Sequence, residues 1–141
     1  MSRIYWDTML FAYLLEDNPA HAARVRQIIG CMEKRRDTLC TSVLTIGELL
    51  VVPYKRGSTE VAQQIRYYLQ PPTVEILPFT VETAERFARI RGEHRVTPAD
   101  AIHLASAAQA GVDLFLTNDR KLQALVVLGI DFIAGMDVNL F

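Results

Sequence analysis

The feature that most constrains the fold is the order of segments along the chain. Short runs rich in β-branched and aromatic residues alternate with longer runs of helical character. This alternation is typical of a parallel sheet covered by helices, and it predicts an α/β fold. The predicted strands are Arg3–Trp6, Thr38–Thr41, Val74–Leu77, Asp113–Leu116 and Ile130–Ile133, and the predicted helices are Thr8–Leu15, Ala20–Arg36, Val43–Lys55, Thr59–Leu69, Val81–Arg91, Pro98–Ala110 and Arg120–Leu128.

Length and composition set the class of protein. The chain has 141 residues, half of them hydrophobic, which suits one domain (residues 1–141) with a sizeable core. Fifteen basic and 16 acidic residues leave a formal charge of -1, so a nucleic-acid partner would need local basic patches. Two cysteines, Cys31 and Cys40, are too few for a zinc motif or a disulfide framework. With no leader or membrane-span pattern, we expect a cytoplasmic protein without a membrane partner.

Two acidic residues directly follow predicted strands. Asp7 follows "RIYW", and Asp119 ends "LFLTND". Open parallel sheets bind ligands beyond the carboxyl ends of their strands, so both residues are candidates for a functional site. Each also precedes a predicted helix and would serve equally well as its N-cap. If the two strands are neighbours, the two carboxylates approach one another, which two independent caps would not require.

Glu48 lies inside the apolar helix "SVLTIGELLVV", where capping cannot explain it. Its helical neighbours at three and four positions are Leu44, Thr45, Val51 and Val52, so we expect its carboxylate to be partly buried. Burial of an ionised carboxylate without a partner costs at least several kcal/mol. Something cationic should compensate it, and the sequence leaves open an arginine or a metal ion.

Asp100 is the fourth acid, near the start of the predicted helix "PADAIHLASAAQA". Thr97 can cap this helix, Pro98 suits its first turn, and an acid three residues after the cap favours the helix dipole. Local capping is therefore a sufficient explanation of Asp100. His103, one turn later, is interpreted as a partly buried histidine with a satisfied ring nitrogen rather than as a metal ligand.

Taken together, the four acids predict a metal site. Several carboxylates packed together repel one another unless a hard divalent cation neutralises them. Oxygen ligands fit Mg²⁺ or Mn²⁺, and the absence of paired Cys and His residues argues against zinc. Such a site is suited to phosphodiester hydrolysis, because the metal binds phosphate oxygens and promotes hydroxide formation from water.

The sequence resembles the PIN-domain ribonucleases, and among them the VapC toxins of toxin–antitoxin pairs. The resemblance rests on "YWDTMLFAYLL", "TSVLTIGELL", "TPADAIHLASAAQAG" and "LFLTND", in this order. It implies a three-layer α/β/α fold with a central, mainly parallel sheet of four to five strands, a Mg²⁺ or Mn²⁺ site and endonuclease cleavage of RNA. It also implies a homodimer inhibited by a cognate antitoxin. By matched position the site residues are Asp7, Glu48, Asp100 and Asp119, with Thr117 or Thr8 orienting water or metal.

Some features favour other interpretations. Met9 and Leu122 depart from residue types common in the family, which weakens the assignment of subgroup and substrate. A PIN-fold binding module, whose acids are only caps and ion pairs, is the main alternative to a nuclease. A receiver-like phosphoryl-transfer domain is disfavoured, because no acid ends the strands Thr38–Thr41 and Val74–Leu77. Candidate RNA-binding cations, for each of which a solvated helix-face or helix-end charge is the favoured explanation, are Lys34, Arg35, Arg36, Lys55, Arg56, Arg86, Arg89, Arg91, Arg95, Arg120 and Lys121.

Overall fold

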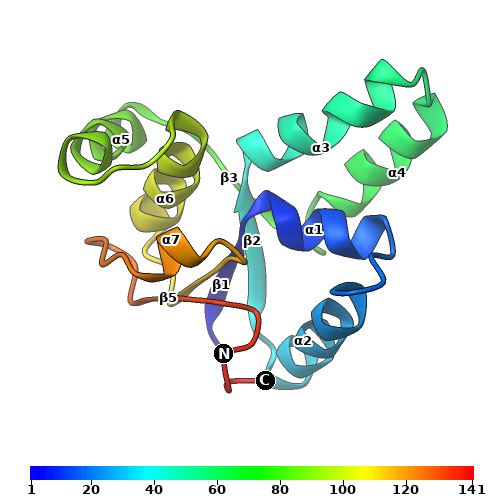
Figure 1. Cartoon of the computed structure of the whole chain (residues 1–141), viewed down its shortest axis with the longest axis horizontal. Helices are drawn as coiled ribbons and strands as arrows, with labels where there is room; N and C mark the ends of the chain where they lie inside the picture. Colours follow the sequence, from blue (N-terminus) through cyan, green and yellow to red (C-terminus); the bar gives the residue numbers. More distant parts are fainter.

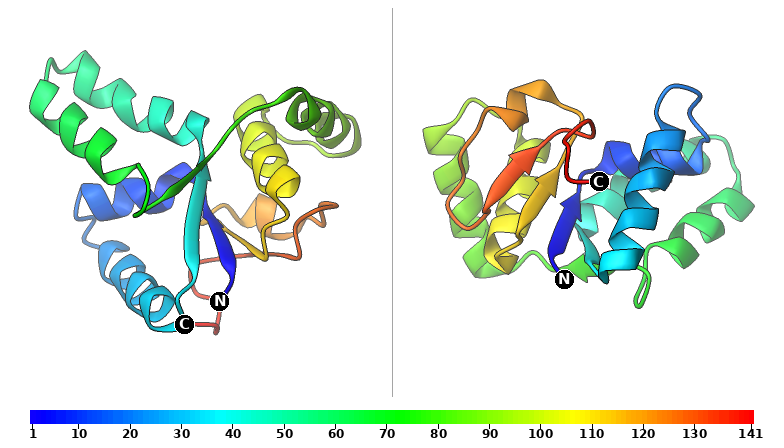
Figure 2. Two further views of the ribbon diagram at one scale, coloured as in Figure 1. Left: turned by 180° about the vertical axis from the view of Figure 1, so that it is seen from behind. Right: turned by 90° about the horizontal axis from the view of Figure 1, so that it is seen from below.

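The centre of the molecule is a five-stranded sheet (Figures 1 and 2). The computed structural model describes all residues, 1–141. All four strand pairs are parallel, which confirms the predicted α/β fold. The strands lie in the order β3-β2-β1-β4-β5, and their bounds are β1 (Arg3–Trp6), β2 (Thr38–Ser42), β3 (Glu75–Leu77), β4 (Leu114–Leu116) and β5 (Phe132–Ala134).

Helices cover both faces of this sheet (Figure 1). The first four pack on one face and the last three on the other. None of them is long and apolar enough to cross a bilayer. Their bounds are α1 (Thr8–Leu15), α2 (Ala22–Arg35), α3 (Val43–Lys55), α4 (Thr59–Tyr68), α5 (Val81–Glu93), α6 (Pro98–Ala110) and α7 (Arg120–Gln123).

Strand β1 contributes side chains to both hydrophobic layers, because successive residues of a strand point to opposite faces. Tyr5 packs into the cluster that contains Leu104 of α6 and Phe115 of β4. Ile4 and Trp6 pack into the cluster on the other face, beneath α1, α2 and α4. Tyr5 and Trp6 are fully buried, so β1 is the strand around which both layers are built.

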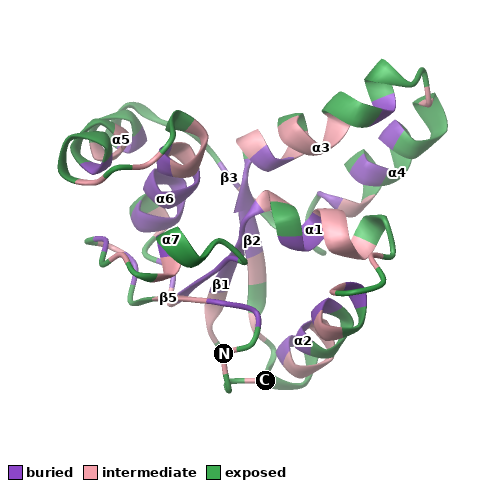
Figure 3. Cartoon of the chain, viewed as in Figure 1, coloured by how far each residue is buried: buried purple, intermediate pink, exposed green.

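Helix α6 lies between the sheet and α5, and most of its surface is covered (Figure 3). Thr97 caps its start through a hydrogen bond from the Asp100 N–H, and Gly111 ends it in a left-handed conformation with φ 66°. A helix covered on several sides needs apolar residues all around, and alanines let its neighbours approach closely. This accounts for the apolar run that follows Asp100.

The prediction of a long last helix, Arg120–Leu128, was wrong, because α7 ends at Gln123. Beyond it Val126 and Leu128 are almost fully exposed, whereas Val127 is buried. The chain leaves the helix so that Val127 and Ile130 can enter the core, and Gly129 makes the turn with φ 101°. The other predicted elements are present, with ends that differ by at most two residues.

The order of strands reverses at β1. From β1 the chain adds β2 and then β3 on one side, and later adds β4 and β5 on the other side. Ligands of open α/β sheets bind at such a reversal, beyond the carboxyl ends of the strands. The segments that begin with Asp7 and Thr117 leave two adjacent strands at this point.

Candidate functional site

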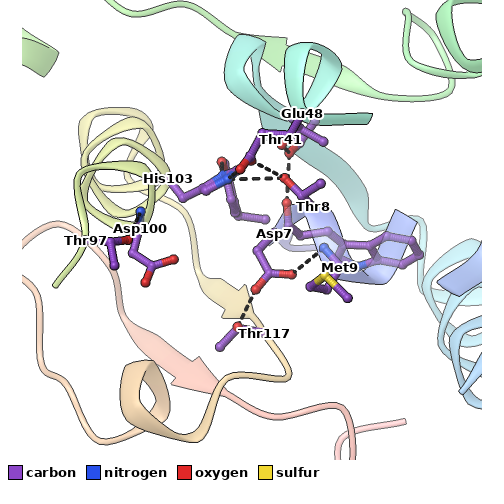
Figure 4. Close-up of polar contacts among 12 residues, drawn as sticks. Asp7, Thr8, Met9, Thr41, Glu48, Thr97, Asp100, His103 and Thr117 are labelled. Atoms are coloured by element: carbon purple, nitrogen blue, oxygen red, sulfur yellow. Dashed lines mark hydrogen bonds and ion pairs between the residues drawn. The ribbon is translucent and has the colours of Figure 1, made fainter. Parts of the chain in front are cut away.

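Asp7 occupies the point where the strand order reverses (Figure 4). Its N–H donates to the Leu116 carbonyl at 3.2 Å, which ties the end of β1 to β4. Its carboxylate caps α1 by accepting the Met9 N–H at 3.1 Å, and it also accepts the Thr117 hydroxyl. The two strands are therefore neighbours, which the sequence had left open, and Thr117 is the residue that bridges their ends.

The Asp7 carboxylate is buried without a cationic side chain. Only 8% of the residue is exposed, and no lysine or arginine lies within ion-pairing distance. Burial raises the pKa of Asp7 above its ordinary value, while the hydrogen bonds from the Thr117 hydroxyl and the Met9 N–H act in the opposite direction. A buried carboxylate of this kind is a natural ligand for a cation supplied from solution.

Glu48 of α3 is half-buried and held by two other elements (Figure 4). Its Oε1 accepts the Thr8 hydroxyl at 2.6 Å and lies 2.7 Å from Nε2 of His103. These interactions, led by the one with His103, lower the pKa of Glu48 below its ordinary value. The arginine partner considered from the sequence is not present, and a histidine 55 positions away takes its place.

His103 is 4% exposed, and both of its ring nitrogens are engaged, as expected for a buried histidine. Its Nδ1 lies 2.6 Å from the Tyr5 hydroxyl, a contact that the sequence reasoning did not anticipate. The sequence indicated only that Tyr5 lies in a strand next to Trp6, so that the two side chains point to opposite faces of the sheet. That pattern does not specify which helix the Tyr5 side chain meets.

Asp100 is half-buried, and its carboxylate makes no hydrogen bond or ion pair within the protein. The cap of α6 is formed by the Thr97 hydroxyl, which accepts the Asp100 N–H at 3.1 Å. Figure 4 shows the carboxylate extending from α6 on the side where Asp7 lies. Capping therefore uses the backbone of Asp100 and leaves the acidic group free.

Asp119 is exposed, and its carboxylate caps α7 by accepting the Lys121 N–H at 2.9 Å. Its own N–H donates to the Thr117 hydroxyl oxygen at 3.1 Å. Thr117 thus links the Asp119 backbone to the Asp7 side chain. The structure brings Asp7 and Thr117 into contact and Glu48 into contact with Thr8, whereas the Asp119 carboxylate meets no other candidate residue.

The donor chemistry fits a hard divalent cation. No three acidic, histidine or cysteine side chains are close enough to surround one ion by themselves. Mg²⁺, however, is usually held by only one or two carboxylates and keeps several of its waters. Asp7 supplies one carboxylate where the strand order reverses, and the Asp100 carboxylate extends on the same side of α6, with no thiolate present that would favour zinc.

Comparison with known proteins identifies the family. The chain matches the PIN domain over residues 4–127, and it therefore belongs to the PIN-domain family. A search of curated proteins found no match.

Solved structures with the same fold include toxin–antitoxin proteins. VapBC2 from Rickettsia felis, bound to a DNA fragment from its promoter, superposes with a TM-score of 0.76 at 14% identity, covering 94% of this chain and 98% of that one. DNA-bound VapBC from Salmonella typhimurium superposes with a TM-score of 0.68 at 20% identity, covering 96% of this chain and 99% of that one. VapC20 of Mycobacterium tuberculosis, a sarcin–ricin loop cleaving toxin, superposes with a TM-score of 0.65 at 17% identity, covering 79% of this chain and 86% of that one.

Proposed function

We propose that this PIN domain is a metal-dependent endoribonuclease, the toxin of a toxin–antitoxin pair. The observation that carries the proposal is the pair formed by Asp7, which is buried without a cation, and Asp100, whose carboxylate has no partner in the protein. Asp7 follows β1, where the strand order of the sheet reverses, and the Asp100 carboxylate extends from α6 on the side of Asp7 (Figure 4). The structural likeness to VapBC proteins and to an RNA-cleaving toxin supports this choice of reaction.

The residues have separate parts in the proposed site. Asp7 and Asp100 hold the cation, while Thr117 and the Met9 N–H fix the Asp7 carboxylate. Glu48 and Asp119 complete the acidic rim, directly or through water. When bound, Mg²⁺ or Mn²⁺ would supply charge stabilisation at phosphate oxygens and lower the pKa of a bound water.

Capping alone explains only part of the acidic set. Asp7 and Asp119 do cap helices, as the binding-module alternative requires. Glu48 lies in the middle of a helix but is paired with His103, whereas the Asp100 carboxylate neither caps a helix nor has a partner in the protein. A site for a cation accounts for all four acids.

The proposal is tested by cleavage of structured RNA. Purified chain, free of any antitoxin, is incubated with a synthetic sarcin–ricin loop and with total cellular RNA in Mn²⁺ or Mg²⁺. We expect cleavage that stops in excess chelator and returns when the metal is restored. Cleavage that persists in chelator would contradict metal dependence, and no cleavage of any RNA would favour the binding module.

A groove beside the site suits the proposed antitoxin. It has a volume of about 410 Å³, begins at Thr8 and Glu48, and continues between α1, α3 and α4. Apolar side chains of its lining that are 38–47% exposed are Met9, Leu15, Val52 and Val61. An amphipathic helix laid in this groove would bury its apolar face and end at the acidic site. The resemblance to VapC toxins also implies a homodimer, which sedimentation of the purified chain would test.

Val61→Glu is expected to weaken antitoxin binding by at least about tenfold, because a carboxylate would be buried in an apolar interface. The dissociation constant of the complex with the proposed antitoxin would be measured by calorimetry. Val81→Glu is the matched control, since Val81 is 78% exposed on α5 and lies outside the groove. Equal affinities for both variants would exclude this groove as the binding surface.

A further inference from the structure

A buried series of hydrogen bonds leads from Tyr5 through His103 to Glu48, and Figure 4 shows its outer part, from His103 to Glu48. The Tyr5 hydroxyl of β1 lies 2.6 Å from Nδ1 of His103, and Nε2 of His103 lies 2.7 Å from Oε1 of Glu48. Tyr5 is fully buried and His103 is 4% exposed. These hydrogen bonds therefore connect the centre of the sheet, through His103 of α6, to Glu48 on α3.

The direction of these hydrogen bonds follows from the groups involved. A tyrosine hydroxyl is protonated at neutral pH, so Tyr5 has a proton to donate. If it donates to Nδ1, the imidazole carries its hydrogen on Nε2 and donates that hydrogen to the Glu48 carboxylate. This is the only arrangement of a neutral ring in which both contacts are hydrogen bonds.

The two carboxylate oxygens of Glu48 differ as a result. Oε1 receives the Thr8 hydroxyl at 2.6 Å together with Nε2 of His103. No hydrogen bond reaches Oε2. One oxygen is thus fixed by two donors, and the other is free for a ligand.

We propose that Tyr5 and His103 are positioning residues that fix the Glu48 carboxylate for the divalent cation or its hydration shell. This inference rests on the proposed function. Packing alone does not require the Tyr5 hydroxyl, because the ring stacks on Phe115 with centroids 4.9 Å apart, and phenylalanine would stack in the same way. Partners behind a metal-site residue set its orientation and tune its affinity for the metal.

The test removes the hydroxyl alone. Tyr5→Phe keeps the stacked ring and deprives Nδ1 of its donor, and we expect Mn²⁺ affinity measured by calorimetry to fall about tenfold. The ¹⁵N spectrum of the metal-free wild type is expected to show His103 with its hydrogen on Nε2, and Tyr5→Phe to show a mixture of tautomers. His103→Gln, whose amide N–H can replace Nε2–H, should retain more of the Mn²⁺ affinity than His103→Leu. In the His103→Leu background, Tyr5→Phe should have no further effect.

The outcomes separate this inference from the proposed function. Mn²⁺ binding that Tyr5→Phe leaves unchanged, or a wild-type His103 with its hydrogen on Nδ1, would overturn the positioning role alone. A wild-type chain that binds no Mn²⁺ would overturn the proposed function and the positioning role with it.

Discussion

Asp100→Asn is expected to lower metal-dependent RNA cleavage by at least about a hundredfold, since changes behind a metal ligand already cost 10- to 100-fold. The same change should alter the free energy of unfolding by less than about 0.5 kcal/mol. The reason is that the Asp100 carboxylate makes no hydrogen bond in the protein, while its N–H, which Thr97 binds, is unchanged. Initial cleavage rates and urea unfolding of the metal-free protein measure the two effects.

Asp131→Asn provides the matched control. Asp131 is an exposed acid directly before β5, at the amino ends of the parallel strands, whereas the proposed site lies beyond their carboxyl ends. The same substitution there should leave cleavage unchanged. If Asp100→Asn lost more than about 1 kcal/mol of stability and kept its cleavage rate, Asp100 would be a helix-start residue only.

Asp7→Asn is expected to abolish cleavage and yet stabilise the metal-free protein at neutral pH by about 0.5–2 kcal/mol, as often happens when a strained functional group is removed. Burial raises the pKa of Asp7, so the folded protein bears the cost of holding a charged carboxylate there. Asparagine caps a helix about as well as aspartate, and it can still accept the Met9 N–H.

The stabilisation by Asp7→Asn should depend on pH in a defined direction. The folded pKa of Asp7 lies above the ordinary value of 3.8, so the folded state holds this proton more tightly than the unfolded state. Below the ordinary value both states are protonated and the charge costs nothing. As the pH rises through the folded pKa, the cost appears, and the advantage of asparagine grows to its full size.

Urea unfolding in chelator, in steps from about pH 4 to about pH 8, measures this dependence. Added Mn²⁺ should reverse the order of stability, because only the wild type gains from binding it. An advantage of asparagine that is largest at the acid end would contradict the assignment of a raised pKa to Asp7.

The sequence predicted the parallel sheet because alternating strands and helices leave few other arrangements. It also predicted that the carboxylates of Asp7 and Asp119 would approach one another if their strands were neighbours. The strands are neighbours, but the Asp119 carboxylate accepts only the Lys121 N–H. These inferences depend on local pattern and on a general property of parallel sheets. Neither needs the detailed packing of side chains.

Two features depended on packing and could not be predicted in this way. The segment after Gln123 has the apolar character of a helix, but burial of Val127 and Ile130 makes it a loop. The partner of Glu48 is set by how α6 and α3 meet, and the sequence pattern does not specify that contact. In both cases tertiary contacts outweigh local preference.

The most direct test of the central claim is an anomalous difference map from crystals of the chain soaked in Mn²⁺. The proposed site predicts a peak between the carboxylates of Asp7 and Asp100 that is lost in crystals of Asp100→Asn. A peak only elsewhere on the molecule, or an equal peak in both crystals, would show that these two acids do not hold the metal.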